Sequence, residues 1–367
     1  MAQTLLTPSV IAKEALMVLE NELVMANLCY RDFSPEFAHV GSTVTIRKPA
    51  TFSATAFSTT VAVQEIVESS VQVVLDKYYD ISAEITAKEL TLDIADFSSQ
   101  VLAPMMKAHA QEVDNQIFQA IYKTIAGHTA VSSTPAIGDL ANLMAQLDIQ
   151  KCPITERRVV LHPVTQAKYA ALDAVLHADK RGKSLTIDEY RIGRILGADY
   201  YMDQNTPKFT SGISDTAGTF KTGAAAGATA ATIEALTDAE VIAAGDVFKV
   251  VGSDKGYLIV TGGTVSTNAV TITFTPATDA TIAADAVVTF QDTHRVNLAF
   301  HKNAFALVTR PLEPPMGGAR AEVQSYKGIT CRVVYDYTMS NKKNSMSVDI
   351  LYGVKTLDKE LAARLCD

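Results

Sequence analysis

A change in composition divides this chain and constrains its fold more than any single motif. From residue 206 to residue 292 the sequence is rich in Ala, Thr, Gly and Val, with few charges and almost no helical periodicity. Short apolar runs separated by turn residues predict strands at 247–251, 257–260, 269–274 and 287–290, a pattern typical of a small β-barrel or sandwich. Helical and strand patterns alternate on both sides, which predicts an insertion within a parent α+β domain.

Two alternating runs near the N-terminus predict a long hairpin. The first run is Gly41–Pro49, and the second begins at Ser70 and continues to Ile85. Between them lies a tip of small and polar residues that contains Phe52 and Phe57. The neighbouring sequence is too short to bury both faces of such a hairpin. We therefore expect its apolar positions to need another chain.

The strongest helical pattern predicts a spine of about thirty residues, on the order of 45 Å long at 1.5 Å per residue. Pro104 would mark either a kink in this helix or its true start. Its apolar stripe consists of Ile94, Phe97, Val101, Met105, Val113, Ile117, Ile121 and Ile125. Further helices are predicted at 9–29, 139–147 and 164–177, and further strands at 158–162, 195–202 and within 297–353.

Bulk properties exclude several classes of protein. The formal net charge of −8 in 367 residues argues against a dedicated nucleic-acid-binding protein. No apolar run approaches the length of a membrane span, and we expect no signal peptide. Four scattered cysteines without a Cys-x-x-Cys pair predict free thiols in a reducing cytoplasm: Cys29, Cys152, Cys331 and Cys366.

No pattern in the chain indicates catalysis. Gly182-Lys183-Ser184 resembles the end of a phosphate-binding loop, but His177 stands where the first glycine of that loop belongs. The seven histidines form no metal-binding spacing. We expect His109 to be packed and hydrogen-bonded within the spine helix, and His301 to cap a turn. The sequence therefore predicts no enzyme, no cofactor and no metal.

Several short segments resemble the P22-type coat protein family of tailed phages. In the front half they are Gly41–Pro49, Leu92–Phe97, Leu102–Pro104 and Val113–Asp114, and in the closing part Asn297–Phe305, Arg310–Leu312 and Asp349–Gly353. The match covers nearly the whole chain outside 206–292. The inserted segment is shorter than the resemblance leads us to expect, so its contact loops are not carried over.

The resemblance implies an α+β fold of the HK97 capsid type, with a long hairpin, a spine helix, an axial domain and an inserted small β-barrel domain. The implied division of the chain is 1–40 for an N-arm, 41–90 for the extended loop (E-loop) hairpin, 91–134 for a peripheral domain with the spine helix, 135–205 for the first part of the axial domain, 206–292 for the inserted domain and 293–367 for the closing strands and C-terminus.

The implied function is that of a major capsid protein that self-assembles into an icosahedral shell around a double-stranded DNA phage genome. Its expected partners are its own copies in pentamers and hexamers, a scaffolding protein, a portal and non-specifically contacted DNA, with no membrane. Such a protein assembles in the bacterial host cytoplasm and resides in the virion. The candidate inter-subunit contacts are Arg47, Lys48, Phe52, Phe57 and Lys77. The alternative is a β-rich adhesin or tail component that binds a host.

Overall fold

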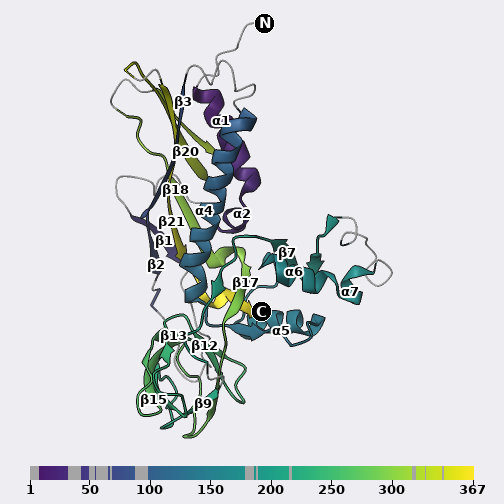
Figure 1. Ribbon diagram of the computed structural model, residues 1–367. Coiled ribbons are helices and arrows are strands. Elements are labelled where there is room, and N and C mark those ends of the chain that lie inside the picture. The colour runs from purple at the N-terminus through teal and green to yellow at the C-terminus, as the bar shows by residue number, and fades with distance from the viewer. Residues whose placement is uncertain are drawn as a thin grey trace. The chain divides into compact units, whose positions relative to one another are not determined.

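Figure 1 shows the computed structural model, which describes residues 8–31, 43–48, 54, 65–66, 68–86, 98–177, 186, 189–214, 217–315, 320–326, 328–340 and 343–367. Contacts between Cα atoms divide the chain into two compact units. The first unit is built from Met1–Glu22, Arg31–Ala110 and Ala306–Leu357, and the second from Leu23–Tyr30, Gln111–Phe305 and Asp358–Asp367.

The first unit is organised around one long strand, β21 (Lys343–Thr356). It pairs antiparallel with β20 (Ile329–Thr338) and with β3 (Lys77–Thr86) along much of its length. It also borders β18 (Phe305–Arg310). The last strand of the sheet is β19 (Arg320–Tyr326), which pairs with β20. Helix α1 (Pro8–Glu22) packs on β19 and β20 through its apolar face, so the sheet is covered by a helix on this side.

The predicted hairpin exists, but it is shorter than expected. Strand β1 (Thr43–Lys48) pairs antiparallel with β2 (Ser69–Val74), from Thr43 opposite Val74 to Lys48 opposite Ser69. The prediction that the second strand continues to Ile85 is wrong. After Leu75 and Asp76 the chain enters β3, which joins the sheet of β21 instead. A two-residue break is enough to redirect a strand, and alternation within each run does not reveal the change of partner.

The root of the hairpin is covered by its own chain. Val44, Val73 and Leu75 are buried together with Ala306 and Val308 of β18. The expectation that the hairpin's apolar positions need another chain is therefore wrong for these residues. The closing strands, remote in sequence, supply the apolar surface that the local sequence lacks.

The predicted spine helix begins at its proline. Helix α4 (Ala103–Ile121) follows a π-helical turn at Ser98–Leu102 and continues into a 3₁₀ turn at Tyr122–Thr124. Pro104 stands in the first turn, where a helix needs no donor from its backbone nitrogen, so it marks a start rather than a kink. Residues 94–97 of the predicted stripe lie outside the described residues.

The second unit contains a mixed sheet with helices around it. Its strands lie in the order β4 (His128–Ala130), β22 (Ala362–Cys366), β17 (His294–His301), β5 (Arg157–Leu161), β7 (Ala198–Met202) and β6 (Gly193–Ile195), and β8 (Lys208–Phe209) pairs with β17. The helices are α2 (Met25–Leu28), α5 (Ile137–Ile149), α6 (Pro163–Ala170) and α7 (Asp173–Leu176). The predicted helix at 139–147 is confirmed, whereas those at 9–29 and 164–177 are each broken in two.

The inserted segment forms a closed six-stranded barrel within this unit. Its strand order is β10 (Ala230–Glu234), β15 (Ala269–Thr275), β13 (Gly256–Thr261), β12 (Val247–Val250), β16 (Val287–Phe290) and β9 (Ala217–Phe220), with a small pair β11 (Val241–Ile242) and β14 (Gly263–Thr264) beside it. Phe248 lies at the centre of the barrel core, with ring centroids 5.2 Å from Tyr257 and 5.5 Å from Phe274. Of the two architectures expected, the barrel is the one observed.

Gly353 tests the packing of the hairpin root on β21. A Cβ at this position would lie 2.3 Å from the carbonyl oxygen of Val74. We expect Gly353→Ala to lower the free energy of unfolding by about 1–3 kcal/mol, because backbone must move to relieve the overlap. Gly138→Ala is the control, since nothing lies within 4 Å of its added Cβ. Equal stability of both variants in chemical denaturation would contradict this packing.

Candidate functional site

The candidate contact residues that the structure describes lie on two different strands. Arg47 and Lys48 are adjacent on β1, and Arg47 is 73% exposed at 3.6 Å from Glu68. Lys77 begins β3, opposite Tyr352 of β21. Phe52 and Phe57 lie outside the described residues, so their role stays a prediction. An ion pair as exposed as that of Arg47 contributes little to stability. Arg47 is therefore available for a contact outside its own chain.

Several of the described histidines form hydrogen bonds with the backbone of the fold. His109 Nε2 donates to the carbonyl of Val348 at 2.7 Å, and His301 Nδ1 accepts from the backbone of Asn303 at 3.2 Å. Both expectations are thus confirmed. Burial lowers the pKa of His128 to about 3 and that of His294 to about 4, so both are neutral at pH 7. Each also bonds a nearby backbone carbonyl.

In the described part of the chain, no group of three or more His, Cys, Asp or Glu side chains has an arrangement that could hold a metal ion. None of the helices described is both long and apolar enough to cross a membrane. Gly182-Lys183-Ser184 lies outside the described residues.

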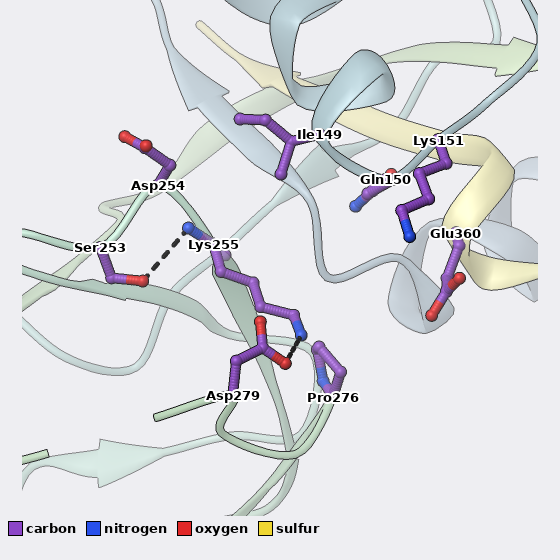
Figure 2. A pocket seen from close by; sticks show the side chains of 10 residues that line it. Ile149, Gln150, Lys151, Ser253, Asp254, Lys255, Pro276, Asp279 and Glu360 are labelled. Carbon is purple, nitrogen blue, oxygen red and sulfur yellow. Dashed lines mark hydrogen bonds and ion pairs between the residues drawn. The ribbon is translucent and has the colours of Figure 1, made fainter. Parts of the chain in front are cut away.

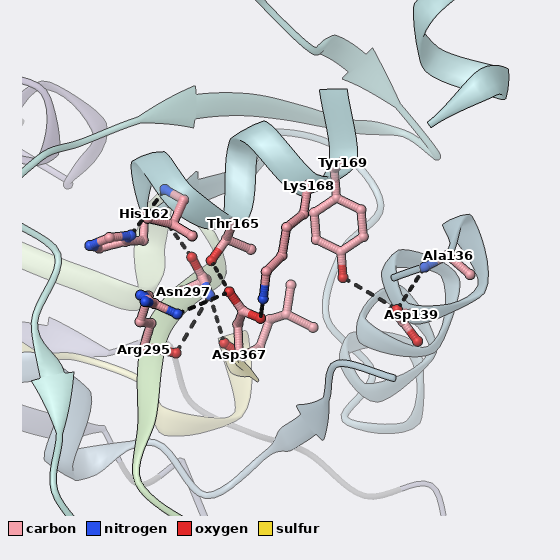
Figure 3. A network of polar contacts seen from close by, with 11 residues as sticks. Ala136, Asp139, His162, Thr165, Lys168, Tyr169, Arg295, Asn297 and Asp367 are labelled. Carbon is pink, nitrogen blue, oxygen red and sulfur yellow. Dashed lines mark hydrogen bonds and ion pairs between the residues drawn. The ribbon is translucent and has the colours of Figure 1, made fainter. Parts of the chain in front are cut away.

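A polar network in the second unit holds the last residue of the chain in place (Figure 3). The Asp367 carboxylate, 3% exposed, accepts from Thr165 at 2.7 Å and forms ion pairs with Lys168 and, at 3.8 Å, with Arg295. Burial alone would raise the pKa of Asp367, but Lys168 and Thr165 outweigh burial and lower it. Beside it, Asn297 accepts from the backbone of His162 at 2.7 Å. The network fastens α6 to the central strands and exposes no reactive group.

A crevice of 450 Å³ lies between the end of α5 and two turns of the barrel (Figure 2). Its charged side chains carry both signs, and Lys255 forms an ion pair with Asp279 at 2.6 Å. Gln146 donates to the backbone of Asp254 at 3.0 Å, which ties the barrel to α5. Among the ten lining residues, no nucleophile is paired with a base. The crevice is a junction between two parts of this unit and offers no catalytic arrangement.

Arg364 joins the barrel to the central sheet from the interior. It is fully buried on β22 and donates to the carbonyl oxygens of Ile125, at 2.8 and 3.0 Å, and of Gly245, at 3.2 Å. Burial lowers its pKa to about 10, so the guanidinium keeps its charge at pH 7. Nearby, Leu258 and Val247 of the barrel are buried against Ala126. These contacts hold the inserted barrel as an integral part of the second unit.

Replacing Arg364 tests this junction. We expect Arg364→Leu to lower the free energy of unfolding by about 3 kcal/mol or more, because two buried carbonyl groups lose their donors. Arg194→Leu is the control and should change stability little, because Arg194 is exposed and lies 3.5 Å from the carbonyl oxygen of Gly197. Chemical denaturation of both variants measures the difference. An equally mild effect at both positions would show that the junction does not depend on Arg364.

Asp114 holds the segment Leu23–Tyr30 against the second part of α4. Its carboxylate accepts from the backbone of Val24 at 2.8 Å and of Ala26 at 3.0 Å. Burial, assisted by the charge of Asp203, raises the pKa of Asp114 to about 7, against the hydrogen bonds that lower it. The sequence showed only an acid on the helix, and its role escaped prediction. An acid inside an apolar stripe is the signal that could have revealed it.

The raised pKa of Asp114 predicts the direction in which the stability of the fold changes with pH. A group whose pKa is higher in the folded state stabilises the fold fully below its unfolded pKa of about 3.9, and this stability is lost as the pH rises through about 7. We therefore expect the destabilisation caused by Asp114→Asn to be roughly 2 kcal/mol larger at pH 5 than at pH 8. Urea denaturation of both proteins at each pH measures it, and a difference that does not vary with pH would contradict the assignment.

Comparison with known proteins identifies the class of fold. No protein-family model and no curated protein matches the chain. Among solved structures it is similar to a chain of Mycobacterium phage Che8, with a TM-score of 0.52 and 14% identity over 94% of this chain and 90% of that one. It is also similar to the capsid structure of the Cyanophage P-SCSP1u, with a TM-score of 0.51 and 14% identity over 94% and 88%.

A third similarity is to the capsid of Ralstonia phage GP4, with a TM-score of 0.50 and 9% identity over 92% of this chain and 87% of that one. The structural neighbours are thus phage capsid proteins. The chain has their mixed α+β fold, and it carries a small closed barrel. Because the sequence identities are this low, the similarity shows only that the fold is shared.

Proposed function

We propose that this chain is a major capsid protein of the P22 type, which self-assembles into an icosahedral shell around double-stranded DNA. The observation that carries the proposal is the shared fold, which extends over about nine-tenths of this chain and of the phage capsid chains. A fold does not by itself define a function, so the assembly experiments below carry the test of this proposal. Among the described residues no group could hold a metal ion, and the crevice beside α5 has no nucleophile paired with a base, which agrees with a structural role.

The proposal assigns a role to each part of the subunit. The β1–β2 hairpin with its tip is the E-loop, which lies across a neighbouring subunit, and α4 is the spine helix of the peripheral domain. The central sheet of the second unit belongs to the axial domain around fivefold and sixfold centres. The barrel is the inserted domain. A shell built this way depends on many weak, repeated contacts, which allow wrongly placed subunits to leave.

The partners follow from the same proposal. Copies of the chain form pentamers and hexamers, a scaffolding protein and a portal guide their assembly, and the packaged DNA is contacted without specificity. The net charge of −8 agrees with a container, because strong adhesion of every subunit to the genome would hinder packaging. The protein would assemble in the host cytoplasm and reside in the virion.

One observation favours a second candidate. Thr232 and Thr271 face outward on adjacent barrel strands with their hydroxyls 3.0 Å apart. A Thr-rich surface of this kind could bind a host as part of an adhesin or tail component. Light scattering distinguishes the two candidates, since the adhesin predicts monomers or small rings and the capsid protein predicts closed particles.

Charge reversal at Arg47 tests the hairpin's role in assembly. We expect Arg47→Glu to change the free energy of unfolding by less than about 0.5 kcal/mol, because the side chain is 73% exposed, yet to lower the yield of closed particles. The double variant Arg47→Glu with Glu68→Lys restores the ion pair within the hairpin. It should remain defective if Arg47 contacts a neighbouring subunit. An unchanged particle yield for the single variant by electron microscopy would refute the proposal for this residue.

A further inference from the structure

Two carboxyl groups face each other across the β3–β21 ladder of the first unit. Asp80 and Asp349 are directly paired in the register, and their carboxyl groups lie within hydrogen-bonding reach of each other. The hydroxyl of Ser347 contacts Asp80 Oδ1 and also lies 2.8 Å from Asp349 Oδ1. Ser82 donates to the other oxygen of Asp80 at 2.7 Å. Like charges in directly opposed positions destabilise an antiparallel pair, so this arrangement requires a compensating feature.

A count of protons shows that this group of side chains lacks one hydrogen-bond donor. Ionised carboxylates only accept hydrogen bonds, and a serine hydroxyl carries one proton. Ser347 can therefore donate to Asp80 or to Asp349, but not to both at once. The contact between the two carboxyl groups likewise has no donor when both are ionised. One additional proton on the pair supplies that donor and removes one of the two negative charges.

The neighbouring charges leave this deficit in place. Arg332 Nε donates to Asp349 Oδ2 at 2.9 Å, and its Nη2 forms an ion pair with the same oxygen, which does not contact Ser347. This ion pair compensates the charge of Asp349 but supplies no donor to the oxygens that face Asp80 and Ser347. Arg332 Nη1 donates to the carbonyl of Glu313 at 2.6 Å. The other titratable neighbours are Tyr78 on β3 and His109 on α4. Burial raises the pKa of Tyr78 above 10.0 and lowers that of His109 below 6.5, so neither alters its charge greatly from about pH 7 to about pH 9.

The two carboxyl groups respond oppositely to their surroundings. Burial and the hydrogen bond to Asp80 raise the pKa of Asp349, in spite of Arg332. Burial alone would raise the pKa of Asp80 as well, but hydrogen bonds from Asp349, Ser347 and Ser82 outweigh burial and lower it. The two titrations belong to the pair as a whole, which retains one proton above the pH at which an isolated aspartic acid loses it.

We propose that Asp80 and Asp349 share one proton and form a pH-dependent latch between β3 and β21. With the proton bound, the carboxyl groups hold the two strands together. When the proton passes to solvent, two negative charges oppose each other across the ladder and β3 opens more readily. Because only Leu75 and Asp76 separate β3 from β2, the latch governs how firmly the chain is held next to the hairpin. The latch goes beyond the proposed function and does not depend on shell assembly.

Amide hydrogen exchange of residues 77–86 in the full-length chain tests the latch. After correction for the intrinsic effect of pH on exchange, we expect the opening equilibrium of wild-type β3 to rise as the pH rises above the ordinary aspartic acid pKa of about 3.9, by at most about tenfold per pH unit for one proton. Stability that comes from a raised pKa is lost as the pH rises, which gives this sign. In Asp80→Asn the amide supplies the missing donor, so the profile should be flat and protection higher at alkaline pH.

Two further variants sharpen the test. Glu84→Gln alters an exposed ion pair with Lys343 farther along β3 and should keep the wild-type profile. Ser347→Ala removes the hydroxyl that contacts both Asp80 and Asp349. The two carboxyl groups then depend more on their shared proton, so the rise in the opening equilibrium of β3 should move to higher pH. Parallel profiles for wild type and Asp80→Asn would overturn the latch. An Asp80→Asn chain that fails to fold at any pH would overturn it too, because the amide should replace the proton.

Discussion

The first unit depends on the backbone ladder of β21. Residues Lys343–Tyr352 of this strand pair with β3, Lys343–Asp349 pair with β20, and β18 adjoins the same strand, so segments remote from β21 in the sequence meet on it. Pairing of this kind is non-local and is secured only when both flanking strands arrive in register. The hairpin root then packs on the same closing strands, and Gly353 permits the close approach of Val74. The last strands of the chain thus fix the position of its first ones.

The sequence predicted the elements better than their partners. Apolar alternation located the barrel strands near 247, 257, 269 and 287, but β9 and β10 were missed because their Ala, Gly and Thr residues give little contrast between the two faces. The run from Ser70 to Ile85 keeps most of its apolar residues at every second position, yet it serves two sheets. Periodicity indicates which residues are buried, but it does not indicate which elements they pack against.

Buried charges were the least predictable part of the candidate site. Arg364 bonds the backbone of Ile125, and Asp114 bonds that of Val24 and Ala26, across separations of 239, 90 and 88 residues. Backbone carbonyl and amide groups leave no mark in the sequence, because every residue carries them. Both charged groups stabilise the subunit itself. Arg47 is exposed, and its role in contacts between chains stays a prediction, as do those of Phe52 and Phe57.

We propose above that this fold builds a closed shell. Electron microscopy of the purified full-length protein over a range of concentrations is the direct test. We expect closed particles of uniform diameter whose surface lattice has icosahedral symmetry. A folded protein that stays monomeric, or that stops at small rings under all these conditions, would contradict it.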